Sequence, residues 1–240
     1  AVPLFPAVAT NDTVRSIMLT LAVIGIVYGA LMSLVQPDFK RLVAYSSVSH
    51  LGFVILGIFA LTIQSVQGAL MVMINHGIST GALFFLVGML YERRHTRLLE
   101  DYGGIARVVP MFGAALTLVA FSSIGLPGTN GVVGEFLVLV GTFRNIPVFA
   151  FIATTVVIIS SIYLLWAVQR VLYNRLDKPV NFHIPDLNRR ELTLLVPLLA
   201  VILWLGIYPK PVLSRMQVSA EHFVQSVQTR ALHPVAEGSE

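Results

Sequence analysis

The 240-residue chain contains no cysteine and little charge. Without thiolates it can form no disulfide, no cysteine-ligated zinc site and no cysteine-held iron–sulfur cluster, so electron transfer would have to take place in a partner. Asp, Glu, Lys and Arg make up 12% of the residues, whereas ordinary soluble domains contain roughly 25%. These shortages exclude an ordinary soluble domain and a redox protein built on its own iron–sulfur cluster.

Apolar residues take the place of the missing charge. They form 56% of the sequence, and the mean hydropathy is +0.81. A membrane-spanning helix needs about 20 mostly apolar residues, and several such stretches are present, which excludes a signal peptide or a single anchor. The 16 Lys and Arg outnumber the 12 Asp and Glu, but they fall in loops, where they report orientation rather than nucleic-acid binding. We expect an all-α, polytopic protein of the lipid bilayer that binds no nucleic acid.

The apolar stretches predict about six transmembrane helices within residues 15–208. Five have ordinary lengths and cover residues 15–35, 42–61, 67–91, 147–169 and 192–208. The sixth, 110–143, would as one straight helix exceed the ~30 Å hydrocarbon core by roughly 20 Å. Its middle reads LPGTNG (126–131), so we expect a broken helix with Pro127, Gly128 and Gly131 at the break.

Two flanking segments complete the division of the chain. Residues 1–14 form an N-terminal segment, and residues 209–240 form a C-terminal tail in which 212–227 has the weak apolar period of an interfacial helix. The chain begins Ala-Val-Pro, without an initiator Met. We therefore expect it to be processed or to be a piece of a longer protein.

The distribution of Lys and Arg predicts the orientation. If the six helices alternate in direction, eleven basic residues fall on one side and five on the other. The first set is Lys40, Arg41, Arg93, Arg94, Arg97, Arg107, Arg170, Arg175, Lys178, Arg189 and Arg190; the second is Arg15, Arg144, Lys210, Arg215 and Arg230. The positive-inside rule makes the first side cytoplasmic and both ends of the chain external.

Three ionisable residues lie within the apolar stretches: His50, His76 and Glu135. Such groups cost about 2.5 to 3.5 kcal/mol each on insertion scales, which makes them functional candidates. Glu135 is expected in the first turn of the second half-helix, where the helix N-terminus favours the carboxylate and burial favours the protonated acid. Opposed effects of this kind suit a group that titrates near neutral pH. The alternative is an ion pair between Glu135 and a lysine elsewhere that only holds helices together.

Both histidines have polar neighbours at helical spacing. Ser46 and Ser49 share a face with His50, and Asn75, Ser79 and Thr80 accompany His76. An imidazole can accept a proton at one ring nitrogen and release one from the other near pH 7, so these clusters suit proton transfer. Two alternatives remain open: purely structural histidines, and a metal site made by both histidines and Glu135. Lys40, at the mouth of its helix, is expected to anchor that helix at the interface.

Four runs carry a resemblance to a known family: QPDFKRLVAYSSVSHLGF (36–53), NHGISTGALFF (75–85), YERRHTR (91–97) and LPGTNGVVGEF (126–136). They resemble the antiporter-like membrane subunits of respiratory complex I, the bacterial NADH–quinone oxidoreductase. The resemblance covers essentially the whole chain. It implies a 14-helix subunit of two inverted repeats, of which the six helices here match the last six, in the cell inner (plasma) membrane.

The resemblance also implies function. His50, His76 and Glu135 would belong to the path along which protons move, while the acid and lysine groups of earlier helices lie outside this chain. NADH, FMN, iron–sulfur clusters and quinone would be bound by partner subunits and no cofactor by this chain, whose partners would be other membrane-arm subunits.

Two further hypotheses stay open. A subunit of a multisubunit cation/proton antiporter would exchange sodium for protons without NADH, although the Tyr91–Arg97 loop favours complex I. A scaffold that only fills the membrane arm would move no protons at all.

Overall fold

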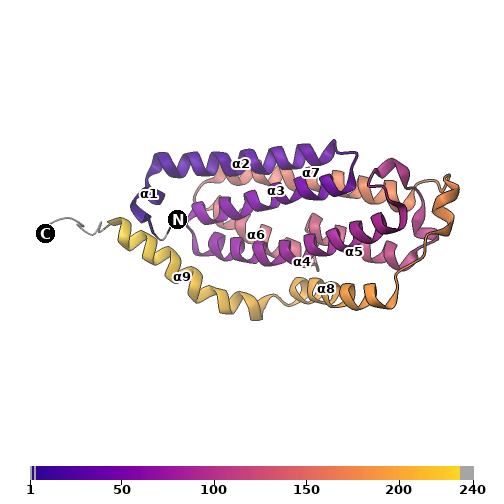
Figure 1. Ribbon diagram of the computed structural model, residues 1–240. Helices are drawn as coiled ribbons and strands as arrows, with labels where there is room; N and C mark the ends of the chain where they lie inside the picture. The colour runs from indigo at the N-terminus through magenta and orange to yellow at the C-terminus, as the bar shows by residue number, and fades with distance from the viewer. Residues whose placement is uncertain (1, 3, 233–240) are drawn as a thin grey trace.

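The computed structural model describes residues 2 and 4–232, and these form a bundle of long helices with no β-strand in that part of the chain (Figure 1). Five of the described helices are long and apolar enough to cross a membrane. They are α2 (Asp12–Leu34), α3 (Phe39–Ala60), α4 (Ile63–Arg94), α7 (Pro147–Val168), which a π-helical turn continues to Tyr173, and α8 (Arg189–Ile207). The predicted class, an all-α polytopic membrane protein, is confirmed.

The stretch 110–143 forms two short helices, α5 (Pro110–Ile124) and α6 (Asn130–Phe143), as a broken helix requires. Gly125 ends α5 in the left-handed region, at φ 83°, and Gly128 in the connecting turn has φ 92°. Both values favour glycine because a Cβ atom is strained there. Pro127 lies between them in the turn. Gly131 lies in the first turn of α6, where a Cβ atom would overlap the carbonyl oxygen of Ser122.

Two further helices lie at one end of the bundle, α1 (Pro6–Thr10) and α9 (Lys210–Leu232). Ala220, Val224 and Val227 form the buried side of α9, and they pack against Val66 and Leu61 at the ends of α4 and α3. The described part of the tail is therefore a helix whose apolar side packs against the bundle. Its location at a membrane interface stays a prediction. Residues 1, 3 and 233–240 of the two predicted flanking segments lie outside the described residues.

Three loops, residues 35–38, 95–109 and 174–188, meet at the opposite end, to the right in Figure 1. We call it the basic end, because these loops and the helix ends beside them carry eleven of the sixteen Lys and Arg. It contains short 3₁₀ helices at Leu99–Asp101, Ile105–Arg107 and Pro179–His183. The backbone of residue 39 donates to the carbonyl of residue 97, and that of residue 99 donates to residue 37. Asp101 accepts from Thr96 and Lys178, and these contacts hold the pKa of its carboxyl below the usual value.

One buried ion pair links three helices at this end. The Arg93 guanidinium of α4 donates to both carboxylate oxygens of Glu191 in α8, at 2.8 and 2.6 Å. Its other hydrogen bonds go to the carbonyls of Met89, Pro185 and Asp186. The Asp186 carboxylate in turn accepts from the backbone N–H groups of residues 111 and 112, at the start of α5. All five guanidinium donors are thus used, which is what a charge needs when it leaves water.

Removing this charge tests how far the contact holds the bundle together. We expect Arg93→Gln to lower the free energy of unfolding by about 3 to 5 kcal/mol, because Glu191 would keep a buried charge without its partner. Thermal or denaturant unfolding in detergent measures the loss. Arg190→Gln, on the exposed surface of α8, is the matched control and should change it by no more than about 0.5 kcal/mol. Equal stability of the two variants would contradict the assigned role of the pair.

Candidate functional site at the helix break

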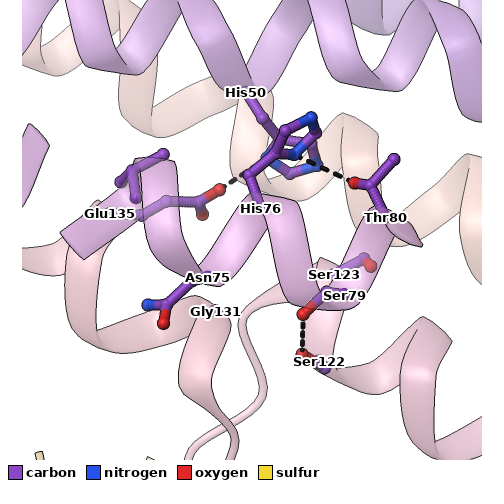
Figure 2. Close-up of a pocket in the computed structure, with 10 residues that line it drawn as sticks. His50, Asn75, His76, Ser79, Thr80, Ser122, Ser123, Gly131 and Glu135 are labelled. Atoms are coloured by element: carbon purple, nitrogen blue, oxygen red, sulfur yellow. Dashed lines mark hydrogen bonds and ion pairs between the residues drawn. The ribbon is translucent and has the colours of Figure 1, made fainter. Parts of the chain in front are cut away.

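The three ionisable residues singled out in the sequence converge at the break between α5 and α6. His50 comes from α3, His76 from α4 and Glu135 from α6, and all three line one cavity (Figure 2). The other lining residues are Val72, Asn75, Ser79, Thr80, Ser122, Ser123 and Gly131. The cavity volume of ≈ 20 Å³ is sufficient for about one water molecule.

The central contact joins His50 to Glu135. Nδ1 of His50 lies 2.7 Å from Oε1 of Glu135, and each residue is 8% exposed. This distance is typical of a charge-assisted hydrogen bond. Either the imidazole N–H donates to the carboxylate, or a carboxyl O–H donates to the ring nitrogen. The partner of Glu135 is thus a histidine, not the lysine of the structural alternative.

His76, which is half-buried, lies beside the His50 ring in the same cavity. Its ring centroid lies 5.4 Å from that of His50, and its Nδ1 lies 3.0 Å from the Thr80 hydroxyl. Nε2 of His50 is buried and has no hydrogen-bond partner among the described residues. His50 therefore stands between Glu135 and His76 with one ring nitrogen engaged and the other unused. That is the arrangement in which an imidazole can receive a proton at one nitrogen and release another.

The position of Glu135 along its helix corrects the prediction. Glu135 was expected in the first turn of the second half-helix, but α6 begins at Asn130 and has no acidic residue in its first turn. Glu135 is the sixth residue of the helix and lies in the second turn. The favourable effect of a helix N-terminus on a carboxylate fades within the first turn. The His50 imidazole, and not the helix terminus, is therefore the main partner of this carboxylate.

A second cluster of polar side chains holds the break in place, and Asn130 is its centre. Oδ1 of Asn130 accepts from the hydroxyls of Ser79, at 3.1 Å, and Ser122, at 2.5 Å. The two hydroxyls lie 2.8 Å apart. The Asn75 side-chain amide donates to the Asn130 carbonyl, at 2.5 Å. These contacts tie α4 to the last turn of α5 and the first turn of α6.

Asn130 and Ser122 were not among the predicted site residues. The available signal was the position of Asn130 in the LPGTNG run, two residues after the Pro-Gly pair. Asn75 and Ser79 were predicted as polar neighbours of His76. Their side chains instead join this clamp, whereas Thr80 contacts the His76 ring.

Three predicted supporting residues lie away from the cavity. The Ser46 hydroxyl donates to the Val43 carbonyl, and that of Ser49 donates to the Ile26 carbonyl in α2. Neither hydroxyl lines the cavity at the helix break, because each donates to a backbone carbonyl elsewhere. Lys40 is exposed at the start of α3 and borders a separate cavity with Tyr91 and Arg97.

Close backbone contact between α4 and α6 fixes the carboxylate in position. A Cβ atom on Gly134 would lie 2.7 Å from the Val72 backbone nitrogen, and one on Gly141 would lie 2.5 Å from that of Ser65. A Cβ atom on Gly68 would meet the Val138 backbone nitrogen at 2.6 Å. All three positions exclude a side chain, so the two helices touch directly. Because Gly134 precedes Glu135, this contact fixes the position of the backbone that carries the Glu135 side chain.

The metal-site alternative finds no support in the geometry. Within residues 2 and 4–232, no group of three or more His, Cys, Asp and Glu side chains is arranged to hold a metal ion. The two histidines and Glu135 form a row in which His50 is central, rather than a set of ligands directed at one point.

Comparisons with known proteins place this geometry in a family. The family model described as "NADH:quinone oxidoreductase/Mrp antiporter, TM" matches residues 1–162. NADH-quinone oxidoreductase subunit M of Pseudomonas aeruginosa is 42% identical over 98% of this chain and 45% of its own length. The subunit M of Mycobacterium tuberculosis is 40% identical over 93% of this chain and 40% of its own. The chain thus spans less than half the length of these relatives.

Solved structures agree with the sequence relatives. Respiratory complex I from Thermus thermophilus with bound NADH contains a chain that matches 90% of this one with a TM-score of 0.85 and 32% identity, over 45% of that chain. The Mrp complex from Dietzia matches 93% of this chain and 50% of its own, with a TM-score of 0.78 but only 19% identity, and shows the shared fold alone. The chain belongs to the family of antiporter-like membrane proteins shared by NADH:quinone oxidoreductase and the Mrp antiporters.

Proposed function

We propose that this chain is the proton-conducting part of a membrane-arm subunit of an NADH–quinone oxidoreductase. The observation that carries the proposal is the buried contact between His50 and Glu135, with His76 beside it in a cavity at a helix break. Ionisable groups are expensive inside a membrane protein and persist where protons or ions move. The assignment to NADH–quinone oxidoreduction comes from the names of the relatives, which are about 40% identical.

The geometry suggests how a proton crosses the site. A proton that reaches Nε2 of His50 makes the ring an imidazolium, and the Nδ1 proton can then pass to Glu135 over the 2.7 Å contact. The imidazole is neutral again and Glu135 becomes a neutral acid, so the transfer leaves no new buried charge. His76 and Thr80 are the groups from which His50 receives the proton, either directly or through water in the cavity. The same steps in reverse release it.

The energy for directed transfer has to come from elsewhere. The chain has no cysteine to hold an iron–sulfur cluster, and in this proposal NADH oxidation and quinone reduction, with FMN and iron–sulfur clusters, take place in partner subunits. Their effect would reach Glu135 as a coupling free energy, through changed charges or helix positions in neighbouring membrane-arm subunits. The acid and lysine groups implied for earlier helices of the full-length subunit would supply the rest of the path.

The structure also supports an orientation. Ends of α2, α4 and α7 and the starts of α3 and α8 meet at the basic end, so eleven Lys and Arg in the loops and the adjacent helix ends lie together. The positive-inside rule makes that end cytoplasmic. Both ends of the described segment would then face the outside of the inner membrane, with the transmembrane domain at residues 15–208.

Replacing the carboxyl group tests the proposal. In vesicles that contain the complete complex with the full-length subunit, we expect Glu135→Gln to lower proton flux through this subunit by about 100-fold, because an amide cannot take up the proton. The proton-to-electron ratio should fall by the subunit's whole share, while quinone reduction with an uncoupler continues. Glu221→Gln, the same change on α9, should leave the ratio unaltered. An unaltered ratio for Glu135→Gln would refute the proposal.

The same vesicles separate the antiporter alternative. NADH-driven acidification that needs no sodium supports the oxidoreductase, whereas sodium–proton exchange without NADH supports an antiporter. If neither His76→Ala nor Glu135→Gln changes proton flux, the scaffold hypothesis is correct.

The clamp at the break makes a second prediction. We expect Asn130→Ala to lower the free energy of unfolding by about 1 to 3 kcal/mol, because buried hydroxyls lose their acceptor. The proton-to-electron ratio should fall as well, since the start of α6 is no longer fixed. A double-mutant cycle with Ser79→Ala, followed by thermal unfolding, should give an interaction energy of about 0.5 to 3 kcal/mol. Strict additivity would show that the two residues do not act together.

A further inference from the structure

A groove lies between α4 and α8, which run side by side up to the basic end (Figure 1). Its cavity volume is ≈ 260 Å³, against ≈ 20 Å³ for the cavity at the helix break, and small-molecule sites commonly measure roughly 300 to 1,000 Å³. Its lining residues are Phe84, Phe85, Gly88, Met89, Glu92, Asn188, Arg190, Glu191 and Leu194. None of them lines the cavity with His50 and Glu135, so this groove is a separate feature of the molecule.

Opposite charges reach this groove as two pairs of sequence neighbours. On α4, Glu92 precedes Arg93, and on α8, Arg190 precedes Glu191. The inner members, Arg93 and Glu191, form the buried ion pair with contacts of 2.8 and 2.6 Å. The side chains of the outer members, Glu92 and Arg190, are exposed and make no hydrogen bond or ion pair within the described chain. The inner pair thus fixes the two helices so that one free carboxylate and one free guanidinium line the same groove.

The wall of the groove nearer the membrane centre is apolar. Phe84, Phe85 and Leu194 are exposed there. The two phenylalanines lie seven and eight residues before Glu92, or roughly 10 to 12 Å along α4. A Cβ atom on Gly88, between these levels, would meet nothing within 4 Å, so the glycine keeps the groove open. Charged groups at a helix end with apolar side chains below them match the division of a bilayer into headgroups and hydrocarbon.

We propose that this groove binds one phospholipid with a primary ammonium headgroup, of the phosphatidylethanolamine class. Arg190 binds the phosphate, which a guanidinium can hold through two N–H donors. Glu92 accepts hydrogen bonds from the ammonium group, and an acyl chain lies over Phe84 and Phe85 and past Gly88. The lipid site does not depend on whether the His50–Glu135 pair moves protons.

The two free charges select this headgroup over other bilayer lipids. A phosphatidylglycerol headgroup offers Arg190 a phosphate but leaves Glu92 without a cation. A choline headgroup carries a positive charge, but its quaternary nitrogen has no N–H group to donate to a carboxylate. Of these three headgroups, only ethanolamine supplies both an anion for the guanidinium and an N–H donor for the carboxylate.

Lipid labelling in the complete complex tests the site. The complex with the full-length subunit is placed in phosphatidylcholine vesicles that contain a trace of a lipid with a photoreactive diazirine in one acyl chain. Three probes share their chains and carry an ethanolamine, choline or glycerol headgroup. Mass spectrometry measures cross-links on peptides that contain residues 84–92 and 189–194. We expect the ethanolamine probe to label these peptides about 3-fold more than either other probe, because only it pairs with Glu92.

Variants assign the preference to particular side chains. Glu92→Gln should abolish the preference for ethanolamine over choline, whereas Glu100→Gln, the same change at the basic end but outside the groove, should keep it. Arg190→Gln should lower labelling by all three probes about 5-fold. Arg189→Gln removes an exposed charge one residue away, outside the groove, and should leave labelling unaltered. Gly88→Leu should lower labelling by all three probes, because its side chain fills the groove.

Each contrary result overturns the lipid site in a recognisable way. Equal labelling by the ethanolamine and choline probes, or a preference that survives Glu92→Gln, would show that the carboxylate does not read the headgroup. Stronger labelling by the glycerol probe would show a general attraction of anionic lipids to the basic end. If other membrane-facing peptides are labelled and these are not, protein covers the groove. The proton-to-electron ratio of Glu135→Gln is measured separately, so failure of the lipid site and failure of the proposed function are distinguished.

Discussion

A carboxyl group and an imidazole in contact inside a lipid-facing bundle are the constraint around which this chain is built. Either group alone would cost several kcal/mol at that depth, and their mutual hydrogen bond offsets the cost only while the two atoms stay about 2.7 Å apart. His50 and Glu135 are 85 residues apart in the sequence and belong to different helices. The surrounding packing therefore has to hold α3, α4 and α6 in one arrangement.

Three glycines and the side chain of Asn130 hold these helices in place in different ways. Gly68, Gly134 and Gly141 bring the backbones of α4 and α6 into contact, so the two helices cannot slide without a clash. The Asn130 clamp fixes the start of α6 relative to α4 and α5, because its side-chain oxygen accepts from Ser79 of α4 and Ser122 of α5. The break thus provides polar groups at membrane depth and a rigid frame for them at the same place.

Much of this could be predicted from the sequence, and the rest has a common cause. Hydropathy indicated the helices, the excess length of 110–143 together with LPGTNG indicated the break, and rarity of charge singled out His50, His76 and Glu135. Helical spacing shows which residues share a face, but not which neighbouring helix that face meets. Ser46 and Ser49 were therefore placed beside His50, whereas their hydroxyls bond to backbone carbonyls of α3 and α2. The contact between His50 and Glu135 was not foreseen.

The two buried ion pairs show how one acidic residue type serves opposite purposes. Glu191 is held by a guanidinium that keeps its proton at every physiological pH and uses all five donors, so that contact can only lock α4 to α8. Glu135 is held by an imidazole, whose proton can move to the acid without leaving either charge exposed. The first pair lies at the basic end, where a fixed link is sufficient. The second lies at the helix break, where His76 and the cavity offer the proton a further acceptor. The chemistry of the partner, more than the burial of the acid, thus decides which ion pair only links helices and which can transfer a proton.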